Sequence, residues 1–406
     1  MGGAGLRRGD RHRADRDDRC DCKVDRAAHG SGNVSARLQA IGFWVAAAGL
    51  LVALALPLSS QAAAAFTSRT GLLVALVAAA AAFALASWRT PVSTVFGLVG
   101  TALGCAVTVM LLQDPAIAGY ASWGYWLMVL AIWLGAILAS TRLADLSAAD
   151  QVTRWLRDLS IPLLFGVFLI YLWEVTVRGF GVSPVLMPAP TSTALRLAQS
   201  LPTLGEDFMQ TFVRSVLAGY AIGCGTGFIV AVVAYRYDFL KRGLLPLGNF
   251  VSALPVVGIA PIMVMWFGFD WQSKAAVVAV MCFFPMLVNT LAGLAVAGPM
   301  ERDLMRSYGA RPLQTLLKLN LPAAMPFIFN ALKINSTLAL IGAIVAEFFG
   351  TPLRGIGFRI SIEVARMSLD MVWAEIALAA VAGMAFYGIV ALAERAVTSW
   401  HPSYRK

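Results

Sequence analysis

Charge and histidine are both scarce in this sequence. Of its 406 residues only 13% are charged and 59% are apolar, and the mean hydropathy is +0.74. A soluble domain carries roughly 25% charged residues, so a chain this apolar lacks the polar groups to cover its own surface. The composition argues against a soluble enzyme, a disordered chain and a nucleic-acid-binding protein.

Several signatures of catalysis and metal binding are also missing. The three histidines, His12, His29 and His401, all lie outside the apolar runs, which argues against a buried catalytic or metal-ligating histidine. Cys20 and Cys22 lie close together, but no second pair completes a zinc site. No G-x-x-x-x-G-K-[ST] motif and no Gly-Lys dipeptide occurs, so the chain does not hold nucleotide phosphates. We predict no metal, no cofactor and no bond chemistry in this chain.

Long apolar runs make up most of what is present. A membrane-spanning helix needs about 20 mainly apolar residues. Ten runs bounded by Gly, Pro or charge approach this length, at 41–58, 71–88, 92–112, 123–141, 159–177, 210–235, 244–268, 275–298, 326–348 and 372–394. The sequence therefore predicts an all-α polytopic protein whose solvent is the lipid membrane.

The runs fall into two blocks. Residues 1–40 hold nine basic and six acidic residues without apolar periodicity, and predict a disordered cytoplasmic tail; a misplaced start codon is the alternative. Four short Ala/Leu-rich runs follow in 41–141. A charged stretch, 142–158, is expected to link them on the cytoplasmic side to six further runs in 159–406.

Basic residues predict the orientation, because Lys and Arg collect in cytoplasmic loops. With the N-terminus inside and ten alternating spans, the inside segments hold 23 Lys and Arg and the outside loops hold seven. This bias accounts for the formal net charge of +10 without an acidic ligand. We expect both termini in the cytoplasm.

The inside loop 299–325 carries the most information. It reads PMERDLMRSYGARPLQTLLKLNLPAAM. The spacing predicts a short helix up to Tyr308, a stop at Gly309, a second helix opened by Pro312, and a break at Leu321-Pro322. The exposed apolar side chains of this elbow need a partner. These side chains could be covered either by a protein partner or by the lipid surface, and the residue pattern alone does not decide between the two.

The same loop resembles the signature of membrane subunits in binding-protein-dependent ABC importers: Glu-Ala-Ala, three residues, Gly, nine residues, Ile, one residue, Leu-Pro. Asp303, Leu304 and Met305 stand at the Glu-Ala-Ala place, Arg306, Ser307 and Tyr308 follow, and Gly309 is the glycine. Leu319 takes the Ile place before Leu321 and Pro322. The spacing matches throughout, while Asp, Leu, Met and Leu319 depart from the usual residues.

The resemblance extends over roughly residues 160–400. The segments VLMPAPTSTALRLAQS (185–200), SALPVVGIAPIMVMWFGF (252–269), CFFPMLVNTLAGL (282–294) and IGAIVAEFFG (341–350) resemble the nitrate/sulfonate/taurine branch, which includes riboflavin and pyrimidine-precursor transporters. Residues 1–150 have no counterpart in the six-helix family pattern. The resemblance implies a six-helix permease core preceded by four extra transmembrane helices.

A mechanism and a set of partners are implied by this family. The elbow is a coupling helix that docks on a separate ABC ATPase subunit, which binds the ATP. An extracytoplasmic solute-binding protein delivers a solute, here a small organic anion or a vitamin-like heterocycle. The resemblance also implies a second permease copy and a place in the plasma (inner) membrane.

Polar residues within the runs are candidates for other roles. Asn289, Asn335 and Glu347 could face a solute pathway, although interhelical hydrogen bonding is the stronger expectation for the asparagines. Arg214 lies near the end of its run, which favours a structural role. Small residues recur every four positions in run 210–235, at Ser215, Gly219, Gly223 and Gly227, and favour packing within the chain over a dimer seam.

Two other functions compete with this interpretation. An ion-driven secondary transporter would favour inverted repeats and intramembrane acids, but no convincing repeat relates 41–141 to 159–394, and mid-span acids are scarce. A membrane enzyme would need a cluster of His, Asp or Glu on one face, and no such cluster stands out.

Overall fold

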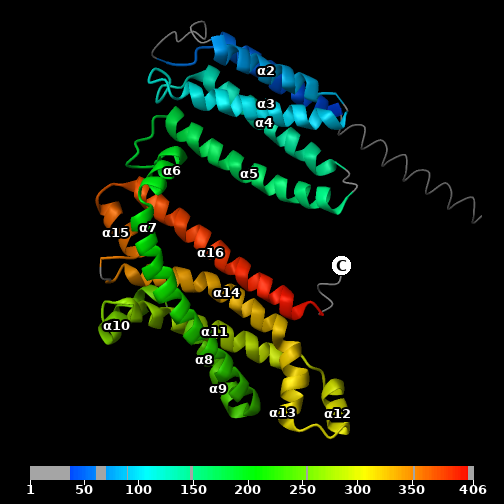
Figure 1. Ribbon diagram of the computed structural model, residues 1–406, viewed down its shortest axis with the longest axis vertical. Coiled ribbons are helices and arrows are strands. Elements are labelled where there is room, and N and C mark those ends of the chain that lie inside the picture. Colours follow the sequence, from blue (N-terminus) through cyan, green and yellow to red (C-terminus); the bar gives the residue numbers. More distant parts are fainter. Residues whose placement is uncertain are drawn as a thin grey trace, which may run out of the picture. The chain divides into compact units, whose positions relative to one another are not determined.

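The computed structural model describes residues 37–60, 70–88, 90–146, 150–252, 255–350 and 353–400. Eight helices within these ranges are long and apolar enough to cross a membrane, and two shorter apolar helices accompany them. The described ranges contain helices and a single isolated β-bridge, between Ser59 and Ala121. The protein is an all-α, polytopic membrane protein (Figure 1), as the apolar runs predict. Of the expected tail, residues 1–36 lie outside the described part of the chain, which begins at position 37.

The chain divides by packing into two compact units, 1–183 and 184–406. The first unit contains the helices Arg37–Ala55, α2 (Thr70–Ala86), α3 (Pro91–Leu111), α4 (Trp123–Asp145) and α5 (Gln151–Gly179). One apolar core, which includes Phe43, Phe83 and Ile132, joins all five helices. The Ala-rich pattern of this block is therefore used for close helix packing.

Helix α5 belongs to the first unit by its contacts. Tyr171 on α5 shares a buried hydrogen bond of 2.9 Å with Thr108 on α3. At the C-terminal end of α5, the amide of Gly119 donates to the carbonyl oxygen of Arg178 over 2.9 Å. The division by packing thus places α5, which belongs to the expected block 159–406 for most of its length, with the helices of the first unit. That α5 opens the importer core stays a prediction.

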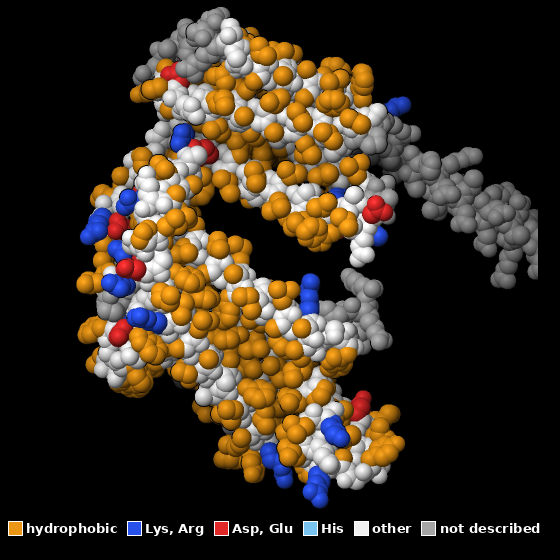
Figure 2. Space-filling model, viewed as in Figure 1, with side chains coloured by type: hydrophobic (Ala, Val, Ile, Leu, Met, Phe, Trp, Pro, Cys, Tyr) orange, Lys and Arg blue, Asp and Glu red, His pale blue; other side chains and the backbone are white. Residues whose placement is uncertain are grey.

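The second unit contains the helices that carry the motifs. Its elements are α6 (Pro190–Gln199), α7 (Leu201–Phe208), η2 (Met209–Val216), α8 (Leu217–Arg236), α9 (Asp238–Ser252), α10 (Val256–Phe267), α11 (Trp271–Leu294), α12 (Pro299–Ser307), α13 (Pro312–Thr315), η3 (Leu316–Asn320), α14 (Leu321–Glu347), α15 (Ile356–Ala365) and α16 (Leu369–Thr398). Helix α11 lies at the centre, packed mainly against α8 and α14. Within this unit, on the face shown in Figure 2, charged side chains gather toward the ends and apolar side chains cover the middle.

The run 244–268 is not one span. The structure places a helix end at Ser252 and a new helix start at Val256, with Pro255 in an extended conformation between them. Proline has no amide hydrogen to continue a helix, and it disfavours helical geometry in the residue before it. The run 244–268 therefore does not form the one span expected from its length, and α9 and α10 are separate elements.

The small-residue stripe packs within the chain, as predicted. A Cβ added at Gly219 would lie 2.5 Å from the carbonyl oxygen of Ala275, and one at Gly227 would lie 2.5 Å from that of Phe283. At Gly223 it would meet the carbonyl oxygen of Ala279. Glycine at these positions lets the backbones of α8 and α11 approach directly.

We expect Gly223→Ala to destabilise the protein by about 1–3 kcal/mol, because the added methyl group must push α8 away from α11. Gly225→Ala on the same helix is the matched control, since a Cβ there meets no atom within 4 Å. Thermal unfolding of both purified variants in detergent measures the difference. Equal midpoints for Gly223→Ala and the unchanged protein would contradict this packing.

Candidate functional site

The predicted elbow is present between α11 and α14. Helix α12 ends at Ser307, and Gly309 follows with a φ of +69°. The amide of Gly309 donates to the carbonyl oxygen of Arg306 over 2.8 Å, and that of Ala310 donates to Met305 over 3.0 Å. These bonds satisfy carbonyl groups at the end of α12 and turn the chain toward α13.

The elbow presents apolar side chains that no other described part of the chain covers. Leu304, Tyr308 and Leu313 are 56%, 82% and 64% exposed. Asp303 pairs with Arg306 across 3.4 Å, and both side chains are exposed. The structure therefore keeps the predicted residues 303–309 together on one short helix and its turn, with an open surface.

Leu321 and Pro322 do not break the chain. Residues Pro312–Glu347 form one continuous helix of 36 residues. Its π-helical turn η3 directly precedes Pro322, and the amide of Leu321 donates to the carbonyl oxygen of Leu316, five residues earlier. This wider turn shifts the hydrogen-bond ladder and accommodates the proline ring. The predicted break is wrong, and Leu321 and Pro322 lie where the elbow joins the α14 span.

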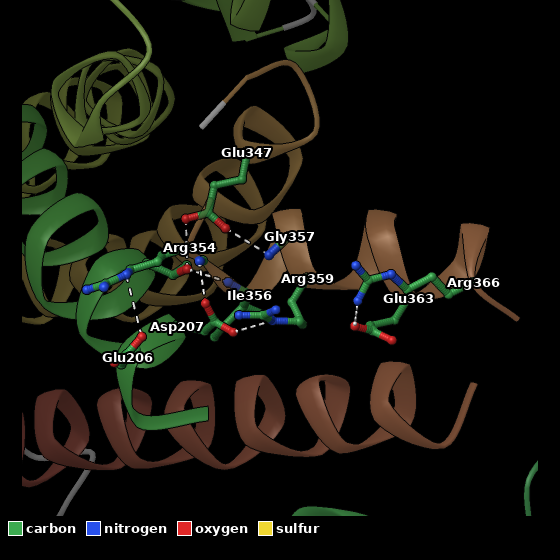
Figure 3. Close-up of polar contacts among 11 residues, drawn as sticks. Glu206, Asp207, Glu347, Arg354, Ile356, Gly357, Arg359, Glu363 and Arg366 are labelled. Atoms are coloured by element: carbon green, nitrogen blue, oxygen red, sulfur yellow. Dashed lines mark hydrogen bonds and ion pairs between the residues drawn. The ribbon is translucent and has the colours of Figure 1, made fainter. Parts of the chain in front are cut away.

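The far end of α14 holds a buried carboxylate. Glu347 is 1% exposed. Its Oε1 accepts a hydrogen bond of 2.7 Å from the Thr211 hydroxyl on η2, and its Oε2 accepts one of 2.8 Å from the amide of Gly357 on α15 (Figure 3). Both oxygens are satisfied by neighbouring elements, as a buried carboxyl group requires.

A second buried carboxylate lies beside it. Asp207 on α7 is fully buried, accepts a 2.6 Å hydrogen bond from the amide of Gly355, and forms an ion pair of 2.8 Å with Arg359. The amide of Ile356 donates to the Thr211 hydroxyl over 2.8 Å. We call this group the carboxylate clasp; its members are Asp207, Thr211, Glu347, Gly355, Ile356, Gly357 and Arg359.

Glycine is required at one clasp position because Glu347 occupies the space of its side chain. A Cβ at Gly355 would lie 2.7 Å from the carboxyl carbon of Glu347, and the φ of Gly355 is +130°. That conformation is disfavoured for residues with a side chain. The Gly-x-Gly turn thus lets the backbone amides approach the carboxylates.

The electrostatics of the clasp favour a charged Arg359. Burial of Arg359 on its own lowers its pKa, but the hydrogen-bonded Asp207 carboxylate outweighs this and raises the pKa above the ordinary value. The carboxyl groups of Glu375 on α16 and Glu363 act in the same direction on the pKa of Arg359. Arg359 is therefore a fixed cation that holds α15 against α7.

The three predicted pathway residues lie apart. Asn289 donates to the carbonyl oxygen of Pro285 in its own helix over 2.8 Å. Asn335 is fully buried and donates to the carbonyl oxygen of Cys282 on α11 over 2.8 Å and to the sulfur of Cys224 on α8 over 3.2 Å. Interhelical bonding thus accounts for the amide nitrogen of Asn335. A solute pathway through these residues stays a prediction.

Sequence reasoning missed Asp207, Thr211 and Arg359. Asp207 lies before the apolar run 210–235. Because only the run was taken as helical, the sequence did not indicate that the helix already begins at Leu201. Arg359 entered the prediction only as one of the seven basic residues in the outside loops. A Gly-x-Gly turn after a helix that ends in an acid was the available signal, because free amides in such a turn favour a nearby carboxylate.

We expect Asp207→Ala to cost about 3 kcal/mol of stability, since it leaves Arg359 and the amide of Gly355 without their partner in a buried place. Glu206→Ala is the adjacent control. Its pair with Arg354 spans 3.5 Å between exposed side chains, and such pairs contribute about 1 kcal/mol or less. Unfolding midpoints in detergent test this contrast. A similar loss of stability in both variants would show that the buried pair contributes no more to stability than the exposed pair.

The comparisons with known proteins agree with this architecture. Residues 223–399 match the family "Binding-protein-dependent transport system inner membrane component". The chain is 30% identical over 197 residues (48% of the chain, 78% of the relative) to the formylaminopyrimidine transport permease protein ThiX of Halalkalibacterium halodurans.

Two further relatives cover more of the chain. A putative aliphatic sulfonates transport permease protein, SsuC of Bacillus subtilis, is 29% identical, with 62% of the chain and 89% of the relative covered. The riboflavin transport system permease protein RibX of Chloroflexus aurantiacus is 26% identical, with 66% and 98% covered. The chain belongs to the binding-protein-dependent transport system inner membrane component family, in the nitrate/sulfonate/taurine-type branch of ABC importer permeases.

Proposed function

We propose that this chain is the permease subunit of an ATP-driven importer, and that it forms the solute pathway and couples to a separate ATPase through the loop 299–325. Family membership supports the transport role. The exposed elbow supports the coupling role, because Leu304, Tyr308 and Leu313 form an apolar surface beside a charged pair on a short helix that ends in a tight turn. Such a surface fits a cleft on a partner protein.

The partners follow from the same proposal. ATP binds to the ATPase subunit, and an extracytoplasmic solute-binding protein delivers the solute. A second permease copy completes the pathway in the plasma (inner) membrane, with both termini of this chain in the cytoplasm. Helix α15 lies at the opposite end of α14 from the elbow (Figure 1), so in this orientation it faces the binding protein.

The solute class is inferred from the relatives. Their names specify formylaminopyrimidine, aliphatic sulfonates, taurine and riboflavin. We propose a small organic anion or a vitamin-like heterocycle for this chain. The neighbouring reading frames are first searched for an ATPase and a binding protein; co-purification of the chain with such an ATPase, followed by ATP-driven uptake in proteoliposomes with the binding protein, tests the proposal. A chain that assembles with no ATPase contradicts it.

The turn at Gly309 gives a sharper test of coupling. We expect Gly309→Val to reduce ATP-driven uptake at least about tenfold while the protein still inserts, because a β-branched residue strongly disfavours a positive φ. Gly309→Asn is the matched control, since Asn tolerates this conformation. A Cβ at this position meets no atom within 4 Å, so the two variants differ in backbone preference and not in local crowding. Normal uptake by Gly309→Val would remove the coupling role from this turn.

A further inference from the structure

A groove of about 800 Å³ lies among α3, α4 and α5, within the first unit. Its lining extends over 95–105 on α3, 133–141 on α4 and 161–171 on α5. Residues of the elbow and of the carboxylate clasp take no part in this lining. The proposed function therefore leaves the groove without a role.

The groove is about as deep as one leaflet of a membrane. Ten residues of an α-helix rise about 15 Å, and the hydrocarbon core of a bilayer is about 30 Å thick. One end of the groove lies beside Val95, near the start of α3, and Thr141, near the end of α4. The other end is closed by Tyr171, which is buried and shares its hydrogen bond with Thr108. The groove thus begins near one membrane surface and stops about halfway across the span.

The wall of the groove offers a ligand mainly apolar contact. The hydroxyl of Thr101 donates to the carbonyl oxygen of Gly97 over 2.9 Å, and that of Thr141 donates to Leu138 over 3.0 Å. Both bonds lie within one helix, so these hydroxyl groups donate to their own backbone. An ordered water needs about 2–4 polar partners, which this wall does not supply. The groove therefore suits an apolar occupant.

The shape of the groove selects a thin occupant that enters from the side. Phe165, Val99 and Ile137 line it and are 65%, 44% and 43% exposed. A volume of about 800 Å³ over a length of about 15 Å gives a cross-section of about 50 Å². A helix about 10 Å across with its side chains needs about 80 Å². A hydrocarbon chain, a single row of methylene groups, is thinner, so the groove admits a lipid chain and is too narrow for a helix.

Charged groups of both signs lie at the open end of the groove. The segment 142–158 holds three arginines and three aspartates, so it carries no net charge. Arg154 and Arg157 share the groove face of α5, because they precede the lining residue Ile161 by seven and four positions. Arg157 pairs with Asp158 across 2.9 Å, and Arg154 is exposed. This balanced set suits a headgroup that itself carries both a phosphate and an amine.

We propose that the groove holds one acyl chain of a zwitterionic phospholipid as a resident ligand, with the lipid phosphate at Arg154. The chain lies along α3, α4 and α5, and the guanidinium of Arg154 donates to the phosphate oxygens. Helix α5 packs less closely on α3 and α4 than these two helices pack on each other. The lipid therefore completes the contact between α5 and the other helices of the first unit. This role is independent of the proposed coupling and of the solute.

Native mass spectrometry of the full chain, after an extended wash in mild detergent, counts the phosphatidylethanolamine molecules that stay bound. We expect one, and we expect Ala102→Trp to lower its occupancy about tenfold or more, because the indole fills the groove and the acyl chain loses its apolar contact. Ala106→Trp is the matched control. Ala106 is also exposed, lies one turn further along α3 and is outside the lining, so its variant keeps the lipid.

A photoreactive phosphatidylethanolamine locates the chain without any substitution in the protein. The full chain is extracted from membranes that contain this lipid, washed in the same way and then illuminated. A diazirine at the methyl end of the acyl chain is expected to label residues beside Cys105 and Tyr171. A diazirine near the carboxyl end is expected to label residues beside Thr141 and Ile161. Arg154→Gln lowers the yield of both adducts, because the phosphate loses its guanidinium partner.

Three results overturn the lipid site. A washed chain that retains no phospholipid, or that retains it equally in Ala102→Trp, shows that the groove holds no resident lipid. Adducts that spread over exposed positions of α5 outside the lining, such as Leu163 and Ile170, show ordinary contact with the surrounding membrane. An absence of adducts in the groove shows that another part of the assembly covers it. Each of these results leaves the proposed transport function standing.

Discussion

The buried carboxylate of Glu347 is the constraint on which the second unit depends. A buried carboxyl group needs hydrogen-bond partners for its oxygens, and these are Thr211 on η2 and the amide of Gly357 on α15. The requirement brings the end of α14, the start of α15 and the η2 segment to one point. Asp207 and Arg359 then close the same junction with a second buried pair. Buried polar groups at this junction thus connect helices that are far apart in the sequence.

Helix α14 links this junction to the elbow. The helix is continuous from Pro312 to Glu347, so the clasp at one end and the exposed turn at Gly309 at the other are joined by a single element. Its packing against the central α11 and against α16 supports it along its length. In the proposed importer, this element connects the ATPase side with the opposite membrane face. The η2 segment, which contributes Thr211 to the clasp, lies at the clasp end of this element.

Features that depend on local pattern were predictable from the sequence, and features that depend on distant contacts were not. The turn at Gly309 and the glycine stripe of α8 follow from residue type and spacing over a few positions. The separation of α9 and α10 at Pro255 and the continuity of the helix through Pro322 depend on how each proline is accommodated by its surroundings. The clasp could not be predicted from the sequence, because Asp207 and the amide of Gly355 are 148 positions apart. The residue pattern within one helix does not indicate which distant residue it contacts.

The most direct test of the coupling claim is a cross-link from the elbow. A benzophenone-bearing amino acid replaces Tyr308, which is 82% exposed, in the assembled complex, and the same residue replaces Trp266 on α10, 71% exposed, as the control. The account predicts that illumination joins position 308 to the ATPase subunit and leaves position 266 without that product. A position 308 that cross-links only to lipid, in a complex that retains its ATPase, would show that the elbow rests on the membrane and would contradict the account.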